Sequence, residues 1–166
     1  MDVNRSIDLE TDSRVMAATR ILDAPRDLVW QAWTDPKHLA QWWGPDGFTT
    51  TTSAHDLRAG GVWRFVMHGL DGRDYENRIT FDEVVKPERL VYRHAGGDDV
   101  EPVQFATTVT FDEIGGNGMP SRTRLTVRSV FPSAAERARV IRDYGADRGL
   151  AQTLARLGAH LATLMS

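Results

Sequence analysis

The segment RILDAPRDLVWQAWTDPKHLAQWWGP, residues 20–45, decides how the chain begins to fold. Its first residues complete an apolar run over 14–22 that predicts a strand. Pro25 and the apolar residues at helical spacing after it predict a helix, and Pro36 stands at the favoured opening position of a second, shorter helix. The sequence therefore predicts one strand followed by two short helices.

Two of the five tryptophans, Trp42 and Trp43, stand at the end of the second predicted helix. Gly44 and Pro45 follow at once and stop the helix there. The pair therefore brings a large apolar surface to a point where the backbone turns. On its own, this pattern is explained if both indoles fill a hydrophobic gap.

From residue 48 to residue 131 the apolar residues recur with a period of two, which is typical of strands. Clusters of Gly, Asp, Asn and Pro divide this part of the chain into six runs. We expect strands over 48–57, 62–69, 75–85, 89–94, 103–111 and 122–131. Runs this short, joined by turns, predict an antiparallel meander.

The segment from Ser133 to Met165 shows one continuous helical pattern. Ser133 is placed as the N-cap, and Glu136 three residues later completes a capping box. One apolar stripe follows at spacings of four and three, made by Leu150, Leu154, Leu157, Leu161 and Leu164. A helix of this kind packs across one face of a curved sheet, so we expect an α+β fold of two layers.

Alternation along the predicted strands gives the sheet one covered face that is rich in aromatic residues. This face includes Trp63, Phe65, Met67, Leu90, Tyr92, His94, Phe105 and Phe111. The opposite face mixes arginines with acids. That mixture favours cross-strand pairing in solvent over a nucleic-acid surface.

Composition narrows the class of protein. The chain has 166 residues, no cysteine and a formal net charge of -3. The absence of cysteine excludes disulfides and thiolate metal sites, and the charge predicts no general attraction to nucleic acid or anionic membranes. We expect a polar lead-in over residues 1–13, a single domain over residues 14–166, no membrane span and a cytoplasmic location.

Several separated motifs, in this order, resemble one known family. They are the opening segment 20–45, DLRAGGVWRFVMHGLDGR at 56–73, VVKPERLVY at 84–92, RTRLTV at 122–127 and the C-terminal helix. Together they resemble the branch of the START-like, SRPBCC or Bet v-like superfamily that is named after the activator of the 90-kDa heat shock protein ATPase. The resemblance spans about residues 14–164. It implies a helix-grip fold, in which an antiparallel sheet of six to seven strands wraps around a long C-terminal helix and encloses a cavity.

In that fold, one of the indoles of Trp42 and Trp43 covers the cavity while the other packs inward. The resemblance also implies a set of ligand-binding residues. We expect this set to comprise Trp30, Trp33, Trp42, Trp43, Trp63, Phe65, Met67, Tyr75, Asn77, Tyr92, His94, Phe105, Tyr144 and Leu150. Many members of the family have Trp where this chain has Leu150 and Gly where it has Asn77. A smaller side chain at 150 enlarges the expected pocket, and an amide at 77 adds a polar group to it or beside it.

Two acids on the C-terminal helix leave two interpretations open. The leucine stripe, extended backwards, runs through Asp147 and Asp143, which places both carboxylates toward the sheet unless Gly145 and Gly149 kink the helix. An acid that meets His94 in the pocket is a candidate catalytic pair. The favoured alternative keeps both acids in water, paired with neighbouring arginines.

Three functions follow, in order of preference. The first is binding of a small apolar or aromatic molecule, and the second is stimulation of the ATPase of the 90-kDa heat shock protein. The third is a cyclase or hydrolase that uses a His–Asp pair in the pocket. The histidine spacing shows no metal motif, so we expect neither a metal nor a cofactor. Because an exposed edge strand permits pairing without requiring it, we expect a monomer or a weak homodimer.

Overall fold

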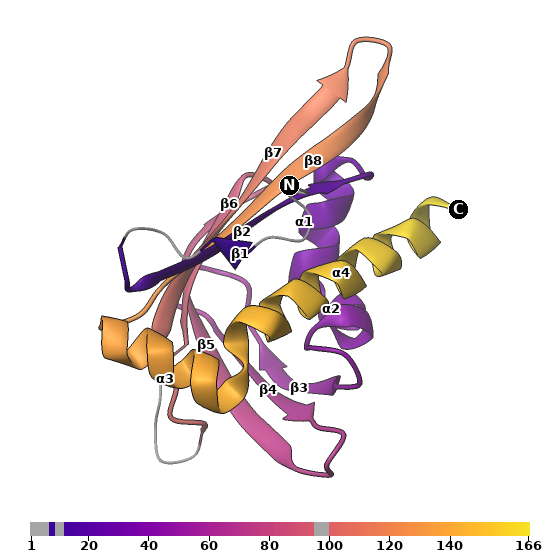
Figure 1. Cartoon of the computed structure of the whole chain (residues 1–166). Coiled ribbons are helices and arrows are strands. Elements are labelled where there is room, and N and C mark those ends of the chain that lie inside the picture. The colour runs from indigo at the N-terminus through magenta and orange to yellow at the C-terminus, as the bar shows by residue number, and fades with distance from the viewer. Residues whose placement is uncertain (1–6, 9–11, 95–99) are drawn as a thin grey trace.

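The computed structural model describes residues 7–8, 12–94 and 100–166. Within these residues the chain forms one antiparallel sheet of eight strands in the order β1-β2-β8-β7-β6-β5-β4-β3 (Figure 1). The strands are β1 (Ile7–Asp8), β2 (Val15–Leu22), β3 (Thr49–His55), β4 (Val62–His68), β5 (Asp74–Val85), β6 (Arg89–His94), β7 (Phe105–Gly116) and β8 (Met119–Val130). Seven of them were predicted, and the two-residue β1 is an addition.

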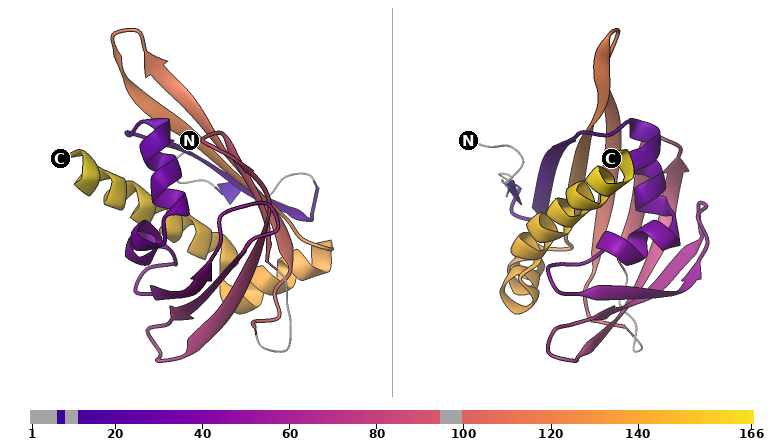
Figure 2. Two further views of the ribbon diagram at one scale, coloured as in Figure 1. Left: turned by 180° about the vertical axis from the view of Figure 1, so that it is seen from behind. Right: turned by 90° about the vertical axis from the view of Figure 1, so that its right-hand side faces the viewer.

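Four helices lie together on one side of this curved sheet (Figure 2). They are α1 (Arg26–Thr34), α2 (Pro36–Trp42), α3 (Ala134–Tyr144) and α4 (Ala146–Met165). α4 packs against β2, α1 and α2, so the sheet and the short helices enclose it from several directions. This confirms the predicted α+β arrangement of a curved sheet around a long C-terminal helix. No helix in the described residues is long and apolar enough to cross a membrane.

The pair β7 and β8 is longer than predicted, and it projects beyond the rest of the sheet (Figure 1). The sequence predicted a loop over residues 113–121. The strands instead continue to Gly116 and Met119, which are paired across a two-residue turn. Asn117 (φ 52°) and Gly118 (φ 91°) both have positive φ, as a tight hairpin turn of type I′ requires. The loop prediction was therefore wrong, because an Asn-Gly pair closes a hairpin with fewer residues than its Gly-rich flanks indicated.

The C-terminal segment is not one continuous helix. Gly145 has a left-handed conformation (φ 62°, ψ 38°) and separates α3 from α4. Glycine adopts this conformation without steric penalty and commonly ends helices in this way. At the start of α3, the side chain of Ser133 accepts a hydrogen bond from the backbone N–H of Glu136 at 3.0 Å, as predicted for an N-cap. The break sets α3 and α4 at an angle, so residues before and after Gly145 no longer share one helical face.

The junction of α1 and α2 explains the position of Trp42. Asp35 caps α2, with its side chain accepting a hydrogen bond from the backbone N–H of Lys37. The carbonyl of Ala32 has no helical donor four residues on, because Pro36 carries no N–H. The indole Nε1–H of Trp42 donates to this carbonyl at 3.0 Å instead. Trp42 is fully buried, so it both fills the core and satisfies the end of α1.

The core lies between the sheet and the helices. The inward positions of β4, β6, β7 and β8 are mostly buried, as alternation predicted, and Leu154, Leu157 and Leu161 of α4 pack against them. Ile7 and Asp8, which fall within the predicted lead-in, pair with β2. Residues 1–6 and 9–11 of that lead-in, and the predicted turn at 95–99, lie outside the described residues.

Candidate functional site

Two adjoining cavities lie between α4 and the covered face of the sheet. The first, called here the inner cavity, has a volume of about 180 Å³. Side chains from β2, β4, β6, β7, β8, α1 and α4 line it, so it lies between the sheet and the long helix. Its lining residues are Met16, Trp33, Trp43, Gly44, Met67, Tyr92, His94, Phe105, Thr107, Val127, Ser129, Phe131, Ala146, Leu150, Thr153 and Leu154.

The second, called here the outer cavity, has a volume of about 310 Å³ and extends toward α3. It is lined by Pro45, Phe48, Met67, Arg73, Tyr75, Asn77, His94, Glu101, Val103, Phe105, Val140, Asp143, Tyr144, Ala146 and Gly149. The two cavities share Met67, His94, Phe105 and Ala146. These four residues border both cavities and form a common wall between them.

The inner cavity is mostly apolar, and besides His94 and Thr153 its polar groups are a short row of hydroxyls on its sheet side. The hydroxyls of Thr107 and Ser129 are hydrogen-bonded at 2.8 Å. Tyr92 lies beside Thr107, and burial raises the pKa of its phenol despite hydrogen bonding from Trp33 and Thr107. Because these hydroxyls are buried and hydrogen-bonded, their positions on the sheet side of the cavity are fixed. They add no charge to its lining.

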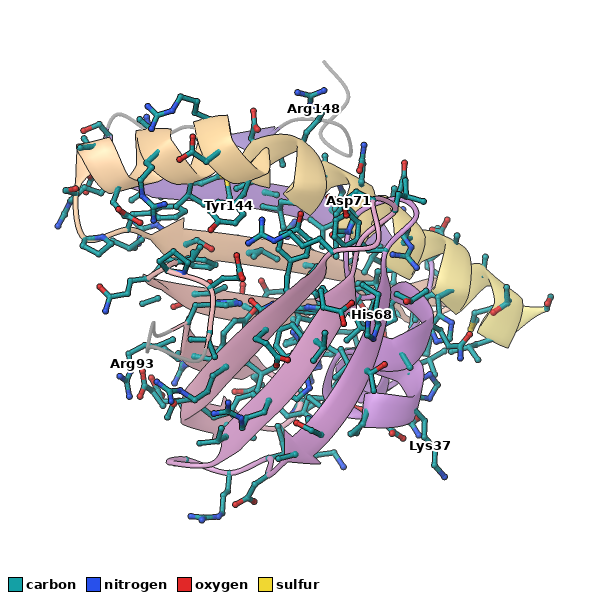
Figure 3. The ribbon with its side chains drawn as sticks, turned by 90° about the horizontal axis from the view of Figure 1, so that it is seen from below. Lys37, His68, Asp71, Arg93, Tyr144 and Arg148 are labelled. Carbon is teal, nitrogen blue, oxygen red and sulfur yellow. The ribbon has the colours of Figure 1, made fainter. Side chains whose placement is uncertain are left out.

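The outer cavity contains charged groups that are paired with one another. A guanidinium N–H of Arg73 donates to the Glu101 carboxylate at 2.7 Å, and the Tyr144 hydroxyl donates to the same oxygen at 3.3 Å. The guanidinium of Arg73 also lies 4.3 Å from the centre of the Tyr75 ring. Tyr144 points from α3 toward the strands (Figure 3). These contacts tie α3, the start of β5 and the segment before β7 into one polar rim.

His94 ends β6 in the wall that the two cavities share. Its ring stacks on Phe105 of the neighbouring strand, with centroids 4.3 Å apart and planes 23° apart. Nδ1 of His94 is buried and has no hydrogen-bond partner. Although the residue keeps some exposed surface, protein surrounds the ring, and this burial lowers the pKa of His94 from 6.5 to about 4. The imidazole is therefore neutral at physiological pH.

The segment between α2 and β3 closes one side of both cavities. Gly44 lines the inner cavity, and Pro45 and Phe48 line the outer cavity. Arg156 of α4 donates to the carbonyls of Gly44 (2.8 Å) and Pro45 (3.0 Å). The backbone N–H of Asp46 donates to Gln152 Oε1 at 3.1 Å. This segment is thus fastened to α4 along the edge of the cavities.

The structure brings most of the predicted ligand-binding residues to these cavities. Ten of them line one cavity or both: Trp33, Trp43, Met67, Tyr75, Asn77, Tyr92, His94, Phe105, Tyr144 and Leu150. The other four, Trp30, Trp42, Trp63 and Phe65, are buried in the core and line neither cavity. Of the indole pair, Trp42 packs inward and Trp43 faces the inner cavity. Alternation places aromatic residues on the covered face, but it does not distinguish those that pack on one another from those that border a space.

The two acids that were candidates to pair with His94 lie on different helices, Asp143 on α3 and Asp147 on α4. Asp143, on α3, is exposed at the edge of the outer cavity and accepts a hydrogen bond from Arg142 at 3.0 Å. Asp147, in the first turn of α4, lines neither cavity. No hydrogen bond or ion pair joins either acid to His94 in the described part of the chain. The catalytic pair stays a prediction, and Asp143 follows the solvated alternative.

Several lining residues were not singled out from the sequence. Met16, Phe131 and Leu154 border the inner cavity, and Arg73 and Glu101 form the polar rim of the outer cavity. The apolar ones belong to periodic strand or helix patterns that predict a core. The ion pair joins residues 28 positions apart, and no local pattern marks such a contact.

Comparison with known proteins supports the fold and the family. A solution structure of a protein from Arthrobacter aurescens is similar over 95% of this chain and 91% of its own, with a TM-score of 0.83 and 24% identity. Protein Ms6760 from Mycobacterium smegmatis is 26% identical over 93% of this chain and 94% of its own, with a TM-score of 0.78.

A third similar structure is DynU16, described as a protein in the dynemicin biosynthetic locus. It is 26% identical, with a TM-score of 0.62, and the match covers 90% of this chain and 48% of DynU16. No curated protein matches the chain.

These likenesses agree with the helix-grip fold expected from the resemblance. The family model described as "Activator of Hsp90 ATPase homolog 1-like protein" matches residues 23–162, which include both short helices, six of the strands and nearly all of α4. The chain therefore belongs to the family of activator of Hsp90 ATPase homolog 1-like proteins.

Proposed function

We propose that this protein binds a small apolar or aromatic molecule in the space formed by the inner and outer cavities. The observation that supports the proposal best is the common wall of Met67, His94, Phe105 and Ala146. This wall lies between an apolar cavity and a larger one with a polar rim. Binding sites for small molecules combine a mostly apolar lining with a few placed polar groups in this way.

The energetics of the inner cavity favour occupation. At about 24 cal/mol per Å³, an enclosed dry space of this size would lower stability by about 4 kcal/mol, and the partly open inner cavity costs less than that. A typical domain is stable by only about 5–15 kcal/mol. An apolar molecule that fills the cavity recovers part of this free energy, so a ligand raises the melting temperature.

A pair of tryptophan substitutions on α4 tests the proposal. Leu150 lines the inner cavity, whereas Leu164 is exposed near the end of the same helix. In Leu150→Trp the new indole is expected to fill the inner cavity. The control Leu164→Trp introduces the same indole at a position exposed to solvent. The uncharged fluorescent dye N-phenyl-1-naphthylamine reports binding by an increase in its emission. We expect saturable binding by the wild type and Leu164→Trp, and at least tenfold weaker binding by Leu150→Trp.

Mass spectrometry under native conditions provides an independent measurement. A stoichiometric small molecule carried through purification of the wild type, and absent from Leu150→Trp, supports the proposal. No dye binding by the folded wild type, or equal binding by wild type and Leu150→Trp, contradicts it. Circular dichroism confirms that each variant is folded.

The family match favours a second candidate function, stimulation of the ATPase of the 90-kDa heat shock protein. A mixed assay with the purified chaperone separates the two candidates. Saturable stimulation that Leu150→Trp leaves unchanged assigns the activity to a surface rather than to the cavities. The similar protein DynU16 is described as lying in a biosynthetic locus, and this favours a small-molecule ligand instead. The cytoplasmic location and the monomer or weak homodimer stay predictions.

A further inference from the structure

His94 is fixed in place by a run of aromatic rings. It is paired with Phe105 across β6 and β7, and their rings are stacked. Phe105 in turn lies 5.0 Å from the ring of Phe131. The imidazole is held by its strand neighbours and borders both cavities, so a molecule bound in either cavity can contact it. A polar group so placed determines ligand orientation.

The two ring nitrogens of His94 differ in their surroundings. In the part of the chain that the structure describes, neither nitrogen has a hydrogen-bond partner, and Nδ1 is the one shielded from solvent. Nε2 is not among the buried atoms, and the ring that carries it borders both cavities. A buried N–H without an acceptor is rarer in proteins than a buried acceptor without a donor. This preference places the lone pair on Nδ1 and the proton on Nε2.

The charge around the cavities disfavours an anionic ligand. The imidazole is neutral, because burial lowers the pKa of His94 to about 4. Among the described residues that line the two cavities, Arg73 is the one arginine or lysine, and its guanidinium is already paired with Glu101. A carboxylate that enters the cavities loses its water and meets no unpaired cation among the described lining residues. Transfer of an unpaired charge out of water is strongly unfavourable.

We propose that His94 selects uncharged apolar ligands that carry a hydrogen-bond acceptor, such as an aryl ketone, by donating the N–H of Nε2 to that acceptor. The inference rests on the proposed ligand-binding function. The apolar body of the ligand occupies the inner cavity, and the acceptor lies at the common wall. His94 acts here as a specificity residue in binding.

Three probes of nearly equal shape test this assignment: 2-acetylnaphthalene, 2-isopropylnaphthalene and 2-naphthoate. They present a neutral acceptor, no acceptor and an anion on the same ring system. Displacement of N-phenyl-1-naphthylamine gives the dissociation constant of each probe for the wild type and for variants. The rings are of suitable size, since a cavity of about 150 Å³ binds benzene and the two cavities together are larger.

Two variants of His94 and one control are compared. His94→Phe keeps a stacking ring and removes the donor, whereas His94→Gln keeps an N–H near the position of Nε2. His55→Phe is the matched control, because His55 also has a buried, unpartnered ring nitrogen and contacts Trp63 and Phe81, yet it lines neither cavity. In His94→Phe we expect the affinity for the ketone to fall about tenfold relative to the hydrocarbon. In His94→Gln and His55→Phe, we expect the ratio of the dissociation constants for the ketone and the hydrocarbon to change less than threefold.

The outcomes separate the inference from the function on which it rests. If the hydrocarbon and the ketone bind but lose affinity equally in His94→Phe, the inference is overturned and the ligand-binding function stands. The inference also fails if 2-naphthoate binds more tightly than the ketone. If the folded wild type binds none of the probes or the dye, the proposed function itself fails.

A spectroscopic measurement on the wild type avoids dependence on variants that fold poorly. In ¹⁵N NMR the two imidazole nitrogens of His94 report which of them carries the proton. We expect a protonated Nε2 whose resonance shifts when the ketone is added and stays nearly unchanged with the hydrocarbon. Protonation at Nδ1, or equal shifts with both probes, contradicts the proposal.

Discussion

Nδ1 of His38 lies 2.9 Å from Nε2 of His160, so a histidine pair joins the short helix α2 to the long helix α4. The two residues are 122 positions apart in the chain. Their rings meet edge to face, with centroids 5.1 Å apart. One ring donates and the other accepts, which requires that the accepting ring be neutral.

The stability of this pair should depend on pH. Burial, and then the charge of His38, lowers the pKa of His160 below its usual 6.5. His160 therefore binds a proton less readily in the folded protein than in the unfolded chain. The stability that neutral His160 contributes above pH 6.5 is lost as the pH falls below that value. We expect His160→Gln to reduce the free energy of unfolding by about 1 kcal/mol at pH 7.5 and by less at pH 5. Urea unfolding at both values measures this difference, with His68→Gln on β4 as control. An identical loss at the two pH values contradicts the prediction.

His94 should make a larger contribution to acid sensitivity. Its pKa is 6.5 in an unfolded chain and about 4 in the folded protein. At about 1.4 kcal/mol per pKa unit, lowering the pH from 7 to 4 removes up to about 3 kcal/mol of stability through this group. We expect His94→Phe to lose less stability than the wild type over this range. Thermal unfolding followed by circular dichroism at pH 7, 5.5 and 4 gives the stability of both proteins as a function of pH. If the stability of His94→Phe falls as steeply as that of the wild type, the prediction is wrong.

The adjacent indoles should respond differently to the same substitution. Trp42→Phe removes the donor to the Ala32 carbonyl and leaves a gap in the core, so we expect a loss of about 2–3 kcal/mol in unfolding free energy. Trp43 borders the inner cavity, so Trp43→Phe should change stability by under about 1 kcal/mol and mainly alter affinity for the dye. Urea unfolding and dye titration on both variants distinguish these effects. Equal stability losses would show that the two indoles serve the same packing role.

Arg156 should control exchange of ligand with solvent. Its guanidinium fastens the Gly44 and Pro45 carbonyls to α4. Arg156→Ala frees this side of the cavities, so we expect faster dissociation of the dye, by about three- to tenfold, in stopped-flow measurements. Arg148 serves as control because it is exposed and points away from the sheet (Figure 3). If Arg148→Ala accelerates dissociation as much as Arg156→Ala, the fastening contacts do not limit exchange.

The sequence was sufficient for most of the fold because its patterns are local. Alternation in β4, β6, β7 and β8, the prolines that open α1 and α2, and the Ser133 cap each depend on neighbouring residues. The break at Gly145 shows the limit of this reasoning. The same glycine is compatible with a continuous helix, a kink or a left-handed cap, and the choice depends on what α3 and α4 pack against.

By itself, the sequence determined the element order, the aromatic covered face and the presence of polar candidates such as His94, because period and turn chemistry act within a few residues. Tertiary structure alone decided that Trp43 and not Trp42 faces a cavity, that Arg73 meets Glu101, and that His38 meets His160. These pairings arise when elements far apart in the chain are brought together. Their geometry follows from the curvature of the sheet and from the angle between α3 and α4, which no local pattern specifies.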